Sequence, residues 1–185
     1  NDPSNNAFQM SQSTDWVRYI LERQRDAPPG LRFSFNSGTA VIITKILENA
    51  TGVPFEEDIQ SFLFDPLDIK SAQWSFTNEG LPNTAWGLQL NSLDLTKIGY
   101  LYLKNGKWVD QQVIPESWVQ ESTALQVQIS NFNDFGRHWW RYSQFNSIQN
   151  VLQQNDIYFG NGFGGQYLYM IPHLNMVVSL TTSNL

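Results

Sequence analysis

Apolar residues recur with a helical period through the first two thirds of the chain. The period is clearest across residues 38–52, where Val41, Ile42 and Ile46 fall on one wide face. Gly52 stands where a C-terminal capping glycine is expected. The pattern therefore predicts a long helix ending near residue 51.

Similar spacing predicts shorter helices over about residues 14–25, from Pro54 onward, over 92–104 and from Pro115 onward. Thr14 and Ser92 are the expected N-caps, and Pro115 suits a first helical turn. Residues 1–13 are polar and are expected to form a loop. Residues 70–91 are expected to be irregular or briefly extended.

The period changes after about residue 125. Residues 136–144, 166–171 and 176–182 are rich in aromatic and β-branched side chains and predict three antiparallel strands. Residues 172–175 have the length of a hairpin connection between the last two. Helices followed by antiparallel strands indicate an α+β fold, with residues 14–125 mainly helical and 126–185 forming a sheet in one domain over 1–185.

Composition excludes several classes of function. The net charge is −6 and the sequence shows no basic stripe, so we expect no nucleic-acid binding. The absence of cysteine excludes disulfides, thiolate metal sites and a cysteine nucleophile. No apolar run is long enough to span a membrane.

Common catalytic and metal-binding motifs are absent from these 185 residues. No serine stands in a Gly-x-Ser-x-Gly elbow, and none is followed by lysine three residues later. His138 and His173 lack zinc-ligand spacing, so both are interpreted as structural or solvated. We expect neither a metal nor a cofactor.

A glycine-rich stretch over residues 160–166 is the most unusual local feature. It precedes a predicted strand and lacks the lysine of a nucleotide-binding loop. It is either a flexible loop ahead of an edge strand or a place where the backbone approaches a ligand closely. Local features favour neither interpretation.

Six segments, in order, carry a resemblance that covers nearly the whole chain. They are residues 29–38, then 50–52, then 64–69, then 86–88 with 94–95 and 98–99, then 113–119, and last 162–166 with 170–172. Together they resemble the C-terminal part of the penicillin-recognising serine hydrolases, closest to the class C β-lactamase-like group with its esterases, D-amino-acid peptidases and 6-aminohexanoate-dimer-type amidases. The resemblance implies a partial β-lactamase/DD-peptidase-like fold that lacks its N-terminal portion.

The resemblance also implies a function that this chain carries only in part. Family members place the nucleophile in a Ser-x-x-Lys motif far upstream of the segment matched by residues 33–38. That motif is missing here, so we expect a fragment of a hydrolase acting on amide, ester or D-amino-acid peptide bonds, inactive in isolation. The alternative is a non-catalytic binding module with the same fold.

The second family motif begins with a proton-transferring tyrosine, and Phe35 stands at that position. Phenylalanine has no hydroxyl and cannot move a proton, which favours the non-catalytic alternative. Ser37 stands where the family often has asparagine. Asn36 can substitute for it, or is itself the matching residue after a shift of one position.

The third family motif maps to Gly160, Asn161 and Gly162, without the cationic residue that many members have. By the resemblance, the backbone N–H of Phe163 is the strand-side donor of an oxyanion hole. Gly164 and Gly165 complete the expected substrate-binding segment.

Partners and location are also expected by resemblance. The full-length protein would take a small-molecule or peptide substrate. A sheet remnant without its neighbouring elements would expose an edge and an apolar face, so we expect self-association or pairing with the missing N-terminal portion. Many relatives are exported, which implies a periplasmic or extracellular location.

Overall fold

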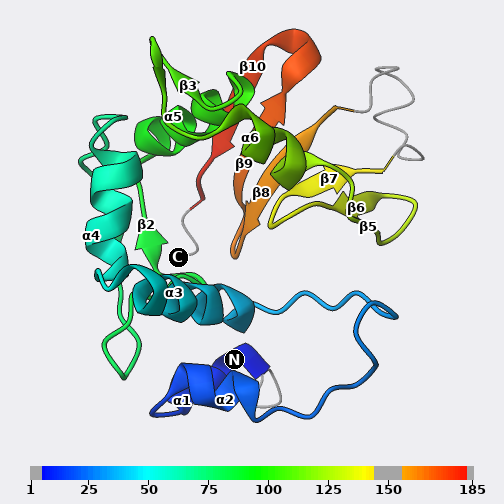
Figure 1. The fold of residues 1–185 in the computed structure, drawn as a ribbon. Coiled ribbons are helices and arrows are strands. Elements are labelled where there is room, and N and C mark those ends of the chain that lie inside the picture. The colour runs from blue at the N-terminus through cyan, green and yellow to red at the C-terminus, as the bar shows by residue number, and fades with distance from the viewer. Residues whose placement is uncertain (1–5, 144–155, 183–185) are drawn as a thin grey trace. The chain divides into compact units, whose positions relative to one another are not determined.

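The computed structural model describes residues 6–143 and 156–182 of the chain (Figure 1). Its helices and strands form two compact units. The first unit comprises the described residues up to 64 together with 71–90, and the second comprises 65–70 together with the described residues from 91 onward. Each unit is built around its own buried cluster.

Helices dominate the first unit. They are α1 (Asn6–Gln12), α2 (Trp16–Leu21), α3 (Gly38–Thr51), α4 (Phe55–Ile59) and a π-helical turn, η1 (Gln60–Phe64). A short antiparallel pair, β1 (Gln73–Trp74) with β2 (Leu88–Gln89), lies in the segment expected to be irregular or briefly extended. The long helix predicted from the apolar period is confirmed as α3.

The expectation of a loop over residues 1–13 is wrong for 6–12, which form α1. Met10 explains the helix, because its side chain is only 1% exposed and packs in a cluster with Trp16, Val41 and Leu81. Burial of this one methionine stabilises the short helix through tertiary contacts, and a single apolar residue produces no periodic pattern in the sequence.

Two predicted N-caps are displaced by one residue. Asp15, not Thr14, caps α2, because its Oδ1 accepts a hydrogen bond from the Arg18 N–H at 2.8 Å. Asn91, not Ser92, caps α5, with its Oδ1 2.7 Å from the Asp94 nitrogen. In each pair both neighbours are capping residue types, so composition alone does not decide between them.

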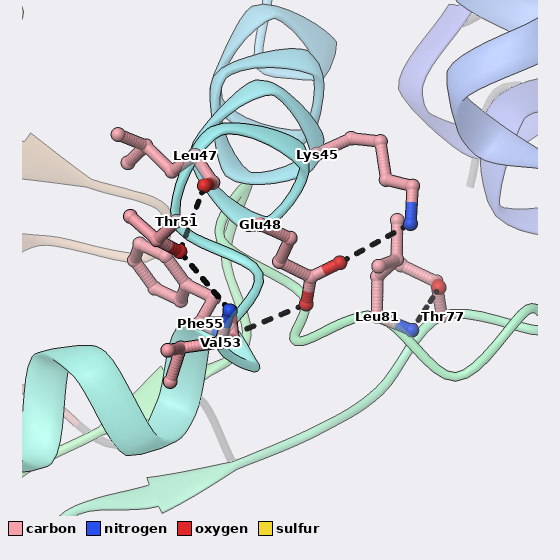
Figure 2. A network of polar contacts seen from close by, with 8 residues as sticks. All are labelled: Lys45, Leu47, Glu48, Thr51, Val53, Phe55, Thr77 and Leu81. Atoms are coloured by element: carbon pink, nitrogen blue, oxygen red, sulfur yellow. Dashed lines mark hydrogen bonds and ion pairs between the residues drawn. The ribbon is translucent and has the colours of Figure 1, made fainter.

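Glu48 holds the turn between α3 and α4 (Figure 2). Its carboxylate lies 3.3 Å from the Lys45 ammonium and accepts a hydrogen bond from the Phe55 N–H, also at 3.3 Å. Gly52 closes α3 in the left-handed conformation with φ of 73°, as the sequence predicted. The hydroxyl of Thr51 donates to the Leu47 carbonyl at 3.0 Å in the same turn.

An antiparallel sheet forms the centre of the second unit. Its strands are β5 (Val127–Gln128), β6 (Asn133–Phe135), β7 (Trp140–Tyr142), β8 (Tyr158–Gly162), β9 (Gln166–Ile171) and β10 (Met176–Leu180). Their spatial order follows the chain, from β10 at one edge to β5 at the other (Figure 1). The same unit contains α5 (Ser92–Leu103), α6 (Glu116–Thr123) and the small hairpin of β3 (Lys107–Trp108) with β4 (Gln111–Gln112).

Three strands were predicted in this sheet, and the described residues contain six. The strand expected over residues 136–144 is instead part of a hairpin, in which β6 and β7 pair across a turn. Gly136 lies so close to α6 that a Cβ there would be 2.5 Å from the Ser122 carbonyl oxygen. His138, which the sequence placed in a strand, has φ of 63° in that turn.

Helix α5 packs across β9 and β10 and closes one face of the sheet. Tyr158, Leu168 and Met170 form the buried cluster between them. Gly99 permits this contact, because a Cβ there would be 2.6 Å from a Val177 methyl group. Close packing therefore explains the glycine within the helix.

The predicted connection after β9 is confirmed. Residues Pro172–Leu174 make a 3₁₀ turn, and Asn175 takes the left-handed conformation with φ of 50°. Asp156 stabilises this turn. Its Oδ2 accepts a hydrogen bond from the His173 backbone N–H at 2.8 Å, and its Oδ1 lies 2.8 Å from the His173 Nδ1. Of the two roles that the sequence left open for His173, structural or solvated, these contacts favour the structural one.

Candidate active-site segments

Phe35, Asn36 and Ser37 lie together in the loop that enters α3. The Asn36 side-chain oxygen accepts a hydrogen bond from the Gly38 N–H at 2.9 Å, and its carbonyl accepts one from the Thr39 hydroxyl at 2.7 Å. A Cβ on Gly38 would collide with Ile20, at 2.4 Å. Glycine therefore lets the start of α3 pack directly against α2.

Asn36 and Ser37 have different local roles. The amide oxygen of Asn36 is used to hold the start of the helix. Ser37 has φ of −60° and ψ of −29°, and its hydroxyl makes no hydrogen bond to any residue that the structure describes. Of the two side chains, Ser37 is the one with its polar atom still available.

Phe35 presents an aromatic ring at the same loop. The residue is 53% exposed. The ring offers apolar contact but no proton. The loop thus combines an exposed ring with an available hydroxyl, within about one turn of a helix start.

The glycine-rich stretch is not a flexible loop ahead of an edge strand, so that interpretation is wrong. Gly160, Asn161 and Gly162 belong to β8, which pairs with β7 on one side and β9 on the other. Gly160 stands opposite Leu168, and Gly162 opposite Gln166. Propensity missed this strand because glycine is unfavourable in strands.

Phe163, Gly164 and Gly165 form the turn that joins β8 to β9. Gly164 and Gly165 have φ of 78° and 88°, a region that side chains with a Cβ rarely adopt. The Phe163 side chain is 93% exposed. Its backbone N–H makes no hydrogen bond with the described part of the chain.

A cavity at the opposite end of β8 was not anticipated from the sequence. It has a volume of about 280 Å³, and Arg141, Asp156 and Tyr158 contribute to its lining. Burial lowers the pKa of Arg141 and raises the pKa of Tyr158. The Arg141 guanidinium donates to the Thr123 carbonyl, so it joins β7 to the end of α6.

Comparison with known proteins identifies the family. The β-lactamase family model matches residues 1–185. The chain belongs to the β-lactamase family. The resemblance seen in the sequence is therefore confirmed.

Individual relatives agree with this assignment. The chain is 23% identical over 175 residues to 6-aminohexanoate-dimer hydrolase of Paenarthrobacter ureafaciens, covering 89% of this chain and 42% of that protein. A Bacillus anthracis structure provisionally assigned as 6-aminohexanoate-dimer hydrolase has a TM-score of 0.76 at 22% identity, covering 88% of this chain and 42% of the other. A penicillin-binding protein from Bacillus halodurans has a TM-score of 0.69 at 17% identity, covering 91% and 57%.

The fold is thus a mixed α+β β-lactamase/penicillin-binding-protein fold present in part. The chain spans less than half the length of the hydrolase that it matches. Within the described residues, no helix is both long and apolar enough to cross a membrane. The same residues contain no group of three or more His, Asp or Glu side chains placed to hold a metal ion.

Proposed function

We propose that this chain is the C-terminal part of a β-lactamase-family serine hydrolase that cleaves amide, ester or D-amino-acid peptide bonds. The observation that carries the proposal is the backbone N–H of Phe163 at the β8–β9 turn, which has no hydrogen-bond partner among the described residues. The family resemblance assigns an oxyanion donor to this position. A main-chain donor persists whatever side chain the position carries.

The chemistry needs a serine from outside these 185 residues, because no Ser-x-x-Lys occurs within them. By the family resemblance, the serine oxygen attacks the carbonyl carbon as its proton passes to the lysine of the same motif, and the carbonyl π electrons move onto the carbonyl oxygen. The Phe163 N–H stabilises that negative charge. Collapse re-forms the carbonyl and expels the amine or alcohol, which takes up the proton, and water then attacks the acyl-enzyme, releasing the acid and returning a proton to the serine. Losing one such donor costs about 10²–10³-fold in kcat where it has been tested.

By the family resemblance, the loop before α3 is a second candidate segment for substrate contact. The Ser37 hydroxyl has no partner in the described residues and can donate to a substrate oxygen. The Phe35 ring can cover an apolar part of the substrate. Asn36 stabilises the loop itself, because its side-chain oxygen accepts a hydrogen bond from the Gly38 N–H at the start of the helix.

Covalent labelling tests the proposal. The complete reading frame that encodes this sequence would be expressed beside the 185-residue chain, and both treated with a fluorophosphonate probe. We expect one labelled serine in the complete protein, within a Ser-x-x-Lys motif, and none in the 185-residue chain. Absence of labelling in a folded complete protein would overturn the proposal, as would labelling of the shorter chain.

The phenylalanine at position 35, where the family has a proton-transferring tyrosine, favours a second candidate function. In it, the protein is a non-catalytic module that binds a small molecule or peptide through the same segments. General acid–base groups contribute about 10²–10⁴-fold, so loss of the tyrosine hydroxyl can remove most activity. In the complete protein, Phe35→Tyr should raise hydrolysis if the rest of the catalytic machinery is intact. Phe33→Tyr, in the same loop, is the control. No gain from Phe35→Tyr in a protein that the probe also fails to label would favour the binding role.

A further inference from the structure

The turn that carries the Phe163 N–H is fixed by a residue far along the chain. Thr182 follows β10, and its hydroxyl donates a hydrogen bond to the Gly164 carbonyl. A Cβ on Gly165 would lie 3.1 Å from the same hydroxyl oxygen, so the turn and Thr182 are in close approach. Two neighbouring residues of the turn therefore face one threonine.

Gln166 holds Thr182 in place. Its side-chain nitrogen donates to the Thr182 carbonyl at 2.7 Å, and its side-chain oxygen lies 3.3 Å from the Thr182 nitrogen. These are the two bonds that a neighbouring strand's peptide would make. The carboxamide thereby extends the pairing of β9 with β10 beyond Leu180, the last residue of β10.

These contacts restrain the backbone on both sides of the Phe163 N–H. On one side of it, Gly162 is paired with Gln166 in the β8–β9 ladder. On the other side, the Gly164 carbonyl is held by Thr182. Gly164 and Gly165 lack side chains and have little conformational restriction of their own, so these contacts determine where the Phe163 N–H points.

We propose that Gln166 and Thr182 are positioning residues for the Phe163 N–H, which they hold as a preformed oxyanion donor. This inference rests on the proposed function for its catalytic consequence. Preformed donors matter because they need no reorganisation as charge develops on the substrate oxygen. Neither residue touches the reacting atoms, so their removal should lower kcat and leave KM nearly unchanged.

The first experiment needs no activity. Backbone ¹⁵N relaxation would be measured on the 185-residue chain carrying Thr182→Val, which keeps the side-chain shape and removes the hydroxyl. We expect the order parameters of Phe163 and Gly164 to fall from about 0.85 toward 0.6, and to return in Thr182→Ser. Thr181→Val is the matched control, since Thr181 is exposed and its side chain makes no hydrogen bond to the described residues. Unchanged order parameters in Thr182→Val would overturn the proposal.

The second experiment uses the complete protein and an activated ester substrate. We expect Thr182→Val and Gln166→Leu each to lower kcat roughly tenfold, a fraction of the loss expected for a missing donor. The double variant should lose little more than either single variant, because both act through one contact. A change in KM alone would overturn the positioning role. If the order parameters of the turn fall in Thr182→Val but the fluorophosphonate probe labels no serine in the complete protein, the result contradicts the proposed function and not the positioning role.

Discussion

Asn36 and Ser37 are adjacent, yet only Asn36 uses its side chain in a hydrogen bond to another described residue. Asn36 uses its side-chain oxygen on the Gly38 N–H, and the Ser37 hydroxyl has no partner in the described residues. The sequence left open which of the two matches the family's second motif. The hydrogen bonding favours Ser37 as the side chain available to a substrate.

Stability measurements distinguish the two residues. Asn36→Ala removes the side-chain acceptor of the Gly38 N–H at the start of α3 and should lower the free energy of unfolding by about 0.5–1.5 kcal/mol. Ser37→Ala removes an unpartnered hydroxyl and should change it by less than about 0.5 kcal/mol. Urea denaturation followed by circular dichroism measures both. A larger loss in Ser37→Ala than in Asn36→Ala would reverse the assignment.

Asp134 is a buried carboxylate with opposing influences on its charge. Burial raises its pKa above the ordinary value of 3.8, while the nearby Arg141 lowers it. Because the folded-state pKa is the higher one, this group favours folding more as the pH falls from neutral toward 3.8. Asp134→Asn removes that dependence.

We therefore expect the stability of Asp134→Asn relative to the parent chain to be greatest near pH 7 and to decline as the pH approaches 4. Urea unfolding at a series of pH values measures the difference. Asp110→Asn, at an exposed position, is the control and should show a nearly constant difference. A relative stability of Asp134→Asn that rises on acidification would contradict the sign of the shift.

At the scale of elements, Gly99 shows how a single missing methyl group positions α5 on the sheet. A Cβ there would lie 2.6 Å from Val177 and 2.9 Å from Leu168, both closer than real Cβ contacts. Gly99→Ala should therefore destabilise the protein by about 1–3 kcal/mol, although alanine is the better helix former. The cost should shrink in a Val177→Ala background. An equal cost in both backgrounds would show that Val177 is not the obstacle.

The elements that sequence reasoning predicted are those with strong local signals. The apolar period indicated α3, and Gly52 indicated where that helix ends. The family motifs indicated candidate site residues at Phe35 and Phe163 through short runs of residues, and these assignments stay predictions. Each of these signals depends on residues close together in the chain.

The features that sequence reasoning missed depend on distant contacts. Helix α1 forms because Met10 is buried against other helices, and β8 forms between two strands despite its glycines. The contact between Thr182 and Gly164 joins residues 18 positions apart through an exposed hydroxyl. No pattern of hydrophobic positions encodes such contacts, because they are decided by packing and pairing in the folded chain.

At the scale of the whole molecule, the six-stranded sheet ends on one side in β10, whose outer edge pairs with no other described strand. Strand β10 spans Met176–Leu180, and both of these terminal side chains are exposed hydrophobic groups. Unpaired edges recruit further strands. We expect the 185-residue chain to self-associate through β10.

A charge placed within β10 tests this expectation. Val178→Lys should shift the chain toward monomer in sedimentation equilibrium, because lysine on an edge opposes strand addition. Val109→Lys adds the same charge at an exposed turn outside the sheet and should leave the association unchanged. If the edge is instead met by a preceding part of a longer protein, that protein should be monomeric under conditions where the 185-residue chain associates. A monomeric 185-residue chain at high concentration would show that the edge of β10 does not drive association.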